Sequence, residues 1–398
     1  MISGQLLAAF EMDSATGRVV LTMEGHGDLE LGERHGLSAA REQVDFILSR
    51  FQATLATSTP TLEALAKAIG DLDHDMGQIA FMLAGESTDR LDEIRARFIK
   101  AWPQWQHPTD VVPIIEIRGH DQEFPFELLP LFDATPVVDF VNYAEAEDAI
   151  QRFLGFGVAV RRTIGEEVQA ADLEATPQLP LQFLRYEMDG TVTEGSYFGE
   201  CLNRIALEGP WPKPDIETKD VRERLIDALY DPMKTLTGEM RGGPPVQIQH
   251  FACHCETSSG TDTGYALILG GPDAGRRSIT LGRIRTGFRV RQQQLGAIAD
   301  ARPLIVANAC GSSKIDKETR RSFPRWFLNN RHRGFLGTET DVPDEVAAAF
   351  AERLYTSLLN EHPLGEAVVL ARRQLMAERC NPLGLLYVLY GDPGLVIA

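Results

Sequence analysis

The stretches VQIQHFACHCE (residues 246–256) and PLIVANACGSS (residues 303–313) carry the clearest structural signal in this chain. Each is a β-prone run that ends in polar residues, a pattern typical of a buried strand leaving a sheet. In an open α/β sheet, functional residues collect beyond the carboxyl ends of the strands. His254 and Cys310 each follow such a run. We therefore expect the two side chains to meet at one edge of a sheet.

Strand and helix patterns alternate around these two stretches. Further β-prone runs lie at residues 111–117, 156–160, 181–186, 265–270 and 334–338. The spacing of apolar residues predicts helices at residues 197–205, 221–229, about 285–297, 320–330, 344–360 and 364–378. This alternation predicts an α/β fold, with a mostly parallel sheet and helices on both of its faces.

The first hundred residues show a different pattern. Two β-prone runs, Leu6–Glu11 and Arg18–Met23, flank a turn-rich DSATG and predict a β-hairpin. Helices are predicted after it at Ala39–Phe51, Leu62–Ala68 and Leu91–Trp102, the last one capped by Ser87 or Thr88. Two punctuating stretches, WPQWQHP (102–108) and RGGPP (241–245), mark the boundaries that we expect along the chain.

Composition and charge exclude several classes of protein. The 398 residues are 43% hydrophobic and 24% charged, with a net charge of −18. That charge argues against general affinity for nucleic acid or for an anionic membrane surface, both of which need excess lysine and arginine. There is no apolar run long enough to span a membrane, and the first residues lack the features of a signal peptide. We expect a cytoplasmic protein.

The five cysteines point to free thiols. Their number is odd and they are scattered over a long chain, unlike the cysteines of a secreted disulfide scaffold; they are Cys201, Cys253, Cys255, Cys310 and Cys380. A free thiol has a pKa near 8.5, so it needs a base to act as a nucleophile at neutral pH. A histidine beside Cys310 would supply that base and later protonate a leaving amine. Gly311 removes side-chain bulk beside the thiol, and the backbone N–H groups of residues 255 and 310–311 are candidate oxyanion donors.

Structural roles are the alternatives for these residues. A cysteine at the end of an apolar strand is often a small buried hydrophobe, and a histidine there is often a hydrogen-bonded structural residue. A metal site made of Cys253, His254, Cys255 and Glu256 is disfavoured, because alternate residues of a strand face opposite sides. No second pair of cysteines completes a tetrahedral zinc site. We expect no metal and no cofactor.

Five blocks in this order and spacing resemble the CHAT domain, a cysteine peptidase family of the caspase and separase clan. The blocks are FACHCETSSGTDTGYALIL, LIVANACGSS, GFLGTETDVPDEVAAAFAERLYTSLL, PLGEAVVLARRQL and LYVLYGDPGL. A weaker match, PIIEIRGHDQEFPFELLPLF (113–132), is similar to the family's N-terminal half. The resemblance implies a caspase-like fold in three parts: a hairpin and helical region (1–108), a degenerate caspase-like subdomain (109–240) and a catalytic subdomain (241–398).

The resemblance assigns roles residue by residue. His254 matches the family's catalytic histidine and Cys310 its nucleophile. Asp341 falls where separase-like members carry an aspartate that binds a basic P1 side chain, although a loop-stabilising role is equally open. Asp344 matches a second acidic position, and we interpret it as the N-cap of a helix that begins at Glu345. The family usually has glycine after the histidine, whereas this chain has Cys255.

Two functions follow from these expectations. The first is an endopeptidase that uses Cys310 and His254 to cut a specific protein partner after a basic residue. The resemblance places such peptidases in prokaryotic defence or cell death, where they cut gasdermins or other effectors. An activator protein is a further candidate partner, and neither nucleic acid nor membrane is expected. The second is a catalytically silent caspase-like module that acts as a protein-binding scaffold.

Overall fold

The structure is a computed structural model that divides into two compact units. Unit 1 comprises Met1–Ile164, Arg353–Leu358 and His362–Gly394, and unit 2 comprises Gly165–Glu352, Leu359–Glu361 and Leu395–Ala398. The residues that the structure describes are 4–12, 18–105, 111–119, 124–133, 135, 137, 140–162, 172–175, 177–186, 193–201, 203–213, 216–258, 264–270, 277–296, 302–314 and 322–398.

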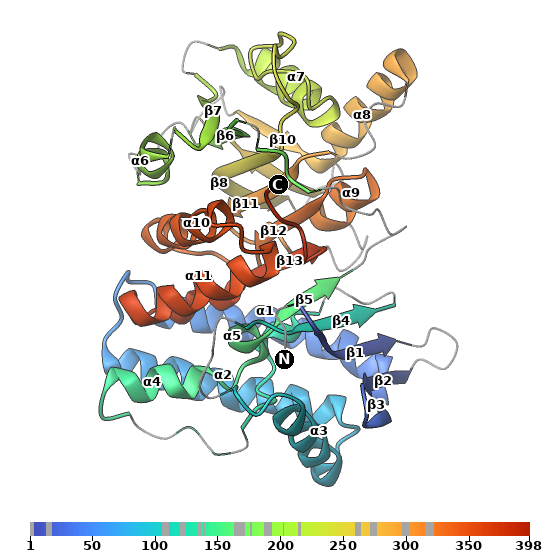
Figure 1. Ribbon diagram of the computed structural model, residues 1–398, viewed down its shortest axis with the longest axis vertical. Helices are drawn as coiled ribbons and strands as arrows, with labels where there is room; N and C mark the ends of the chain where they lie inside the picture. Colours follow the sequence, from blue (N-terminus) through green and yellow to red (C-terminus); the bar gives the residue numbers. More distant parts are fainter. Residues whose placement is uncertain are drawn as a thin grey trace. The chain divides into compact units, whose positions relative to one another are not determined.

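Unit 2 is built on parallel strands joined by helices (Figure 1). Its elements are β6 (Leu179–Arg185), α6 (Thr193–Glu200), β7 (Ile205–Trp211), α7 (Thr218–Tyr230), β8 (Ile248–Ser258), β9 (Gly264–Ile268), β10 (Ser278–Thr280), α8 (Leu281–Leu295), β11 (Leu304–Ala309), α9 (Phe323–Asn329), β12 (Gly334–Thr338) and α10 (Asp344–Leu359). Residues of α10 after Glu352 belong mostly to unit 1.

Strand β11 lies in the middle of this arrangement. It pairs in parallel with β8 on one side and with β12 on the other. Strand β8 also pairs in parallel with β6, and β6 with β7. Strand β9 pairs antiparallel with the C-terminal part of β8, from His254 to Ser258, and β10 pairs antiparallel with β9. All six residues of β11 are buried, as expected for a parallel strand covered on both faces.

Helices cover both faces of the unit 2 strands. On one face of β8, His250 bonds to Glu194 of α6, and Asn308 of the neighbouring β11 bonds to the Ala347 carbonyl of α10. On the opposite face, Gln249 donates to the Ala228 carbonyl of α7. Successive residues of a strand point to opposite faces, so these contacts place α6 and α10 on one face and α7 on the other.

Unit 1 combines a second group of strands with long helices (Figure 1). Its elements are β1 (Leu6–Met12), β2 (Arg18–Met23), β3 (Gly27–Glu33), α1 (Arg34–Thr54), α2 (Leu62–Leu83), α3 (Thr88–Ala101), β4 (Ile114–Arg118), the 3-10 helix η1 (Phe126–Leu128), α4 (Tyr143–Ile150), α5 (Leu154–Gly157), β5 (Ala159–Arg162), α11 (Leu364–Arg379), the 3-10 helix η2 (Pro382–Leu386) and β13 (Tyr387–Gly391).

The predicted hairpin is confirmed and forms part of a larger sheet. Strand β1 pairs antiparallel with β2, and β2 continues into β3, which the sequence did not predict. The other edge of β1 pairs in parallel with β4, and β4 pairs in parallel with β5. The predicted cap of α3 is Ser87, whose hydroxyl accepts a hydrogen bond from the Arg90 N–H. The two strands of the hairpin therefore lie inside the unit 1 sheet, and β3 forms its edge.

The α/β fold class predicted from the sequence is confirmed. The predicted helix at residues 197–205 is wrong in its second half, because a strand, β7, begins at Ile205 and pairs with β6. The expected boundaries after residues 108 and 240 fall inside unit 1 and unit 2, and residues 106–108 lie outside the described residues. The three-part division of the chain stays a prediction. Among the described residues, no helix is both long and apolar enough to cross a membrane.

Candidate active site

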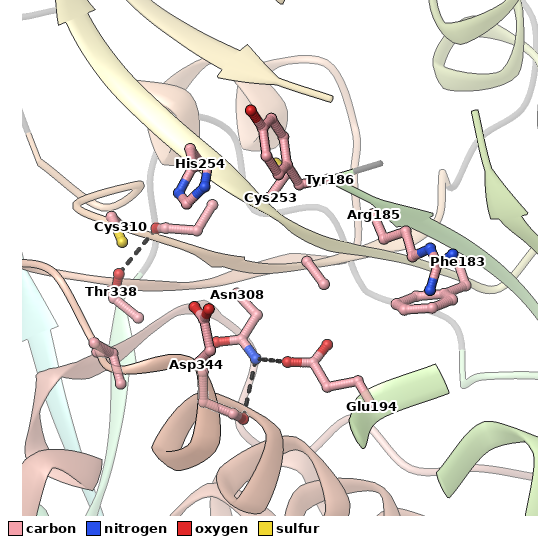
Figure 2. Close-up of a pocket in the computed structure, with 14 residues that line it drawn as sticks. Phe183, Arg185, Tyr186, Glu194, Cys253, His254, Asn308, Cys310, Thr338 and Asp344 are labelled. Carbon is pink, nitrogen blue, oxygen red and sulfur yellow. Dashed lines mark hydrogen bonds between the residues drawn. The ribbon is translucent and has the colours of Figure 1, made fainter. Parts of the chain in front are cut away.

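The register of two neighbouring strands brings His254 and Cys310 together. Strands β8 and β11 run in parallel, and Ala309, the last residue of β11, pairs with Cys253. The next residues along the two strands are Cys310 and His254, and neighbouring strands lie about 4.8 Å apart. Figure 2 shows the His254 ring and the Cys310 sulfur on the same side of a pocket that both residues line. The two residues therefore line one pocket at one edge of the sheet, and their catalytic roles stay a prediction.

The pocket lies beyond the carboxyl ends of the parallel strands of unit 2. It combines the thiol and the imidazole with acidic, basic and apolar side chains. Its lining residues are Phe183, Arg185, Tyr186, Glu194, Ala252, Cys253, His254, Asn308, Ala309, Cys310, Thr338, Val342, Asp344 and Ala347. This is the edge at which ligands of open α/β sheets bind.

A hydrogen-bonded turn fixes the chain directly after Cys310. The Gly311 N–H donates to Thr338 Oγ1 (3.1 Å) and to the Thr340 carbonyl (3.2 Å). Thr338 Oγ1 in turn donates to the Ala309 carbonyl (2.9 Å), and the Ser312 hydroxyl accepts from the Thr338 N–H (3.1 Å). These bonds tie both sides of Cys310 to strand β12.

Gly311 has a structural reason to be glycine. Its φ of +64° lies in the left-handed region, which glycine adopts without steric cost. A Cβ at this position would also lie 3.1 Å from Cδ of Lys314. Its backbone N–H already has two acceptors, so in this conformation it is not free to bind an oxyanion. The expectation of an oxyanion donor at Gly311 is therefore not supported by the geometry.

The Cys310 thiol lies in an environment that disfavours its ionised form. Burial raises the pKa of Cys310, and the negative charges of Asp341 and Asp344 raise it further, while the N–H groups of Val342 and of Cys310 itself act in the opposite direction. The thiol is therefore protonated at neutral pH, where even a free thiol is mostly so.

Cys255 lies in the extended backbone of β8. It pairs with Leu267 of β9, and it is not among the residues with positive φ. The cysteine after His254 therefore fits its backbone without strain. Burial raises the pKa of its thiol, and that of Cys253, well above the usual range.

The acidic residues of the pocket differ from those expected. Asp341 is exposed and is not among the described residues that line the pocket. Asp344 is the first residue of α10, so the helix begins one residue earlier than predicted, and Asp344 lines the pocket. Glu194, from the first turn of α6, also lines it. Figure 2 shows Glu194, Asn308 and Asp344 along one wall.

Asn308, Tyr186 and Glu194 are among the pocket residues that the sequence did not single out. Asn308 donates through Nδ2 to Glu194 and to the Ala347 carbonyl (3.0 Å). The ring of Tyr186 packs edge-on against His254, with ring centroids 4.6 Å apart. The position of Asn308 was a usable signal, because it stands two residues before Cys310, on the same face of an otherwise apolar strand. Glu194 and Tyr186 lie far along the chain from that motif and gave no such signal.

Metal ligands do not cluster in this pocket. Within the described ranges, there is no group of three or more histidine, cysteine, aspartate or glutamate residues that could hold a metal ion. Strand β8 turns His254 to the opposite face from Cys253 and Cys255, as expected from strand alternation.

The chain resembles one known protein family and several solved structures. Residues 190–384 match the CHAT domain model. The chain is similar to a chain of the Saccharomyces cerevisiae separase–securin complex in two structures, with TM-scores of 0.43 and 0.44, 10% and 12% identity, and coverage of 97% of this chain but 30% of that chain. It is also similar to a chain of the complex of Porphyromonas gingivalis RgpB pro- and mature domains, with a TM-score of 0.40, 10% identity, and coverage of 78% of this chain and 70% of that chain.

This chain thus spans under a third of the length of the yeast chains that it resembles. No curated protein sequence matches it. The family match covers most of the pocket, including Glu194, His254, Cys310 and Asp344. The residues that match the CHAT domain model make up just under half of the chain.

Proposed function

We propose that this chain is a cysteine endopeptidase in which Cys310 is the nucleophile and His254 is the general base. The observation that carries the proposal is the parallel register of β8 and β11, which sets the two residues side by side at the edge of a lined pocket. The CHAT domain over residues 190–384 supports the same reaction class.

The reaction begins with proton transfer from Cys310 to His254 as the sulfur attacks the scissile carbonyl carbon. His254 then protonates the departing amine, and water hydrolyses the thioester. Because the raised pKa of Cys310 keeps its thiol protonated at rest, the proton leaves during the attack and not beforehand. We retain the Cys255 N–H as the proposed oxyanion donor, since the Gly311 N–H is already bonded to Thr338 and Thr340.

A basic P1 side chain is the substrate feature that this pocket fits best. Two carboxylates, Glu194 and Asp344, line it against one guanidinium, Arg185. Asn308, which bonds to Glu194, stands two residues before Cys310, about 7 Å along the chain, a distance that a lysine or arginine side chain can span. We therefore propose Glu194 and Asp344, which line the pocket, as the P1-binding groups in place of Asp341, which is not among the described lining residues.

Fluorogenic peptides that differ only at P1 test this specificity. We expect arginine and lysine substrates to be cleaved at least about tenfold faster, in kcat/KM, than leucine or aspartate substrates, because a cation pairs with the pocket carboxylates and an anion is repelled by them. A Cys310→Ala preparation controls for contaminating proteases. Fastest cleavage of the aspartate substrate would overturn the P1 assignment.

A thiol-directed peptide probe tests the dyad without knowledge of the protein substrate. We expect stoichiometric labelling at Cys310, and a rate at least about 100-fold lower in His254→Ala, since general base catalysis is typically worth that much. His362→Ala is the matched control, because His362 lies in unit 1 and bonds to Glu366. The raised pKa of Cys310 further predicts that its alkylation by iodoacetamide accelerates about tenfold per pH unit up to pH 8.5. An alkylation rate that reaches a plateau below pH 7 would contradict the raised pKa of Cys310.

The biological setting rests on the family resemblance. We propose that the enzyme acts in the cytoplasm on one protein partner in a prokaryotic defence or cell-death pathway, of which a gasdermin-like effector is an example. Incubating the purified chain with the product of the neighbouring gene, and mapping any new termini by mass spectrometry, tests this directly.

A catalytically silent scaffold is the second candidate, and the raised pKa of Cys310 is the observation that favours it. A thiol that no base activates would leave the pocket as a surface for binding a peptide. The probe experiment separates the two functions. Selective labelling of Cys310 that depends on His254 supports the enzyme, and equal labelling of Cys310 and the partly exposed Cys201 supports the scaffold.

A further inference from the structure

We infer that His250 is a positioning residue that holds the Glu194 carboxylate in place and thereby sets the preference for a basic P1 side chain. The inference rests on the proposed peptidase function and deepens it. His250 is fully buried and is not among the lining residues of the pocket, so it acts on substrate through the residues that it contacts, and we assign this effect to its hydrogen bond with Glu194.

The His250 imidazole is fixed by its surroundings. Its ring lies between two aromatic side chains, with centroid distances of 5.6 Å to Phe183 and 5.4 Å to Phe198. Its Nε2 lies 2.6 Å from Glu194 Oε2. An ionised carboxylate only accepts hydrogen bonds, so Nε2 carries the proton and donates it. The aromatic contacts fix the direction in which this bond points.

A second donor fixes the other oxygen of the same carboxylate. Asn308 Nδ2 donates to Glu194 Oε1, and the same amide donates to the Ala347 carbonyl of α10 (3.0 Å). His250 pairs with Val306 in the register of β8 and β11, and Asn308 pairs with Ala252. His250 and Asn308 therefore lie on one face of the sheet, and each holds one oxygen of Glu194.

The fixed Glu194 carboxylate favours a substrate with a basic P1 side chain. Glu194 is nearly buried, and its two donors hold the carboxylate where a P1 cation would meet it. A binding group that is held in its final geometry loses little conformational freedom when substrate arrives. Without the His250 donor, one oxygen of a nearly buried carboxylate loses its partner. Loss of the His250 donor should therefore slow cleavage of substrates with a basic P1 residue more than it slows the reaction at Cys310 in general.

The test is the ratio of kcat/KM for arginine and leucine P1 substrates. We expect His250→Leu to lower this ratio at least about tenfold, mainly through a higher KM for the arginine substrate, since a hydrogen bond to a charged group is worth about that factor. His250→Gln keeps an N–H donor with a similar reach, and we expect it to stay within about threefold of the wild type. A purely structural loss would lower kcat/KM for both substrates by the same factor and leave the ratio unchanged.

A second variant keeps the test decisive if His250→Leu does not fold. Glu194→Gln keeps the shape of the side chain and removes its charge, and it should lower the ratio by a similar factor. In the double variant, His250→Leu should have no further effect on the ratio, because the carboxylate that it positions is gone. His362→Leu is the matched control, since it removes a histidine–glutamate hydrogen bond of 2.6 Å outside the pocket.

The outcomes separate this inference from the proposed function. No turnover and no labelling of Cys310 in the wild type would reject the peptidase itself. An active, arginine-preferring wild type whose ratio survives His250→Leu, or survives Glu194→Gln, would reject the role of His250 alone. Equal loss of the ratio in His250→Leu and His250→Gln would also reject it, because the donor would then be irrelevant.

Discussion

Replacing Cys310 with alanine should lower cleavage of the substrate at least about a thousandfold, because no other group in the pocket can form the covalent intermediate. The described lining of the pocket includes one other thiol, that of Cys253. Cys253 is buried, and burial raises the pKa of its thiol well above the usual range. Strand alternation also turns it away from the face that carries His254. It cannot replace Cys310.

The same substitution should leave the fold unchanged. Cys310 follows the end of β11, and bonds of Gly311, Ser312 and Thr338 hold the adjoining turn. The thiol adds a weak hydrogen bond from the Val342 N–H, which alanine removes. Alanine therefore removes one sulfur atom beside an open pocket. Peptide cleavage and thermal unfolding, measured on the same preparation, check both statements. Cys380→Ala is the matched control, since Cys380 is a partly exposed thiol of unit 1. Undiminished cleavage by Cys310→Ala would assign the reaction to another residue.

The sequence predicted the parts of this site that local pattern determines. His254 and Cys310 stand out because each follows a run of residues with strand character, and strands of that kind place their ends at one edge. The strand GFLGT at residues 334–338 has the predicted bounds. Its Gly337 lies against Ser312 and Ser313, where a Cβ would come within 2.7 Å of both hydroxyls. The sequence could not show that contact.

Tertiary contacts account for what the sequence did not predict. Glu194 meets His250 and Asn308, which lie 56 and 114 residues away along the chain, and no local pattern encodes such a meeting. Of strand β7, only Ile205 fell within the helix predicted at residues 197–205, and the pairing with β6 that forms the strand is a contact no local pattern shows. Helix α2 was predicted to end at Ala68, yet its buried positions continue through Leu72, Met76 and Leu83. Gly70 interrupts the helical pattern of apolar residues in the sequence, but the helix continues through it.

Glu127→Gln should destabilise unit 1 by about 3–5 kcal/mol, the usual cost of breaking a buried ion pair from one side. Glu127 is 1% exposed and Arg162 is fully buried. Arg162 Nη1 lies 2.7 Å from Glu127 Oε1, and its Nη2 bonds to Oε2, so the pair is bidentate. The same guanidinium donates to the carbonyls of Phe124 (3.1 Å) and Leu389 (3.2 Å). The pair therefore joins η1, β5 and β13 within unit 1.

The lowered pKa of Glu127 shows that its interaction with Arg162 outweighs the effect of burial. Burial alone would raise its pKa, but the charge and hydrogen bonds of Arg162, together with the charge of Arg372, lower it below its usual value. A carboxyl with a lowered pKa stabilises the fold fully above about pH 4.5, and its contribution is lost as the pH falls below that value. Stability near neutral pH thus includes this pair in full, and glutamine would leave the Arg162 charge buried without its counterion.

Hydrogen exchange in the β4 and β5 peptides of the full chain measures the loss of stability in Glu127→Gln locally. Denaturant unfolding measures the change in the global free energy of unfolding. Glu30→Gln is the matched control, because Glu30 pairs with Arg18 at an exposed site, where an ion pair is worth at most about 1 kcal/mol. Glu127→Gln combined with Arg162→Met removes both charges and should be more stable than Glu127→Gln alone. A loss below about 1 kcal/mol in Glu127→Gln, or no recovery in the double variant, would show that the buried charge is not what holds these three elements together.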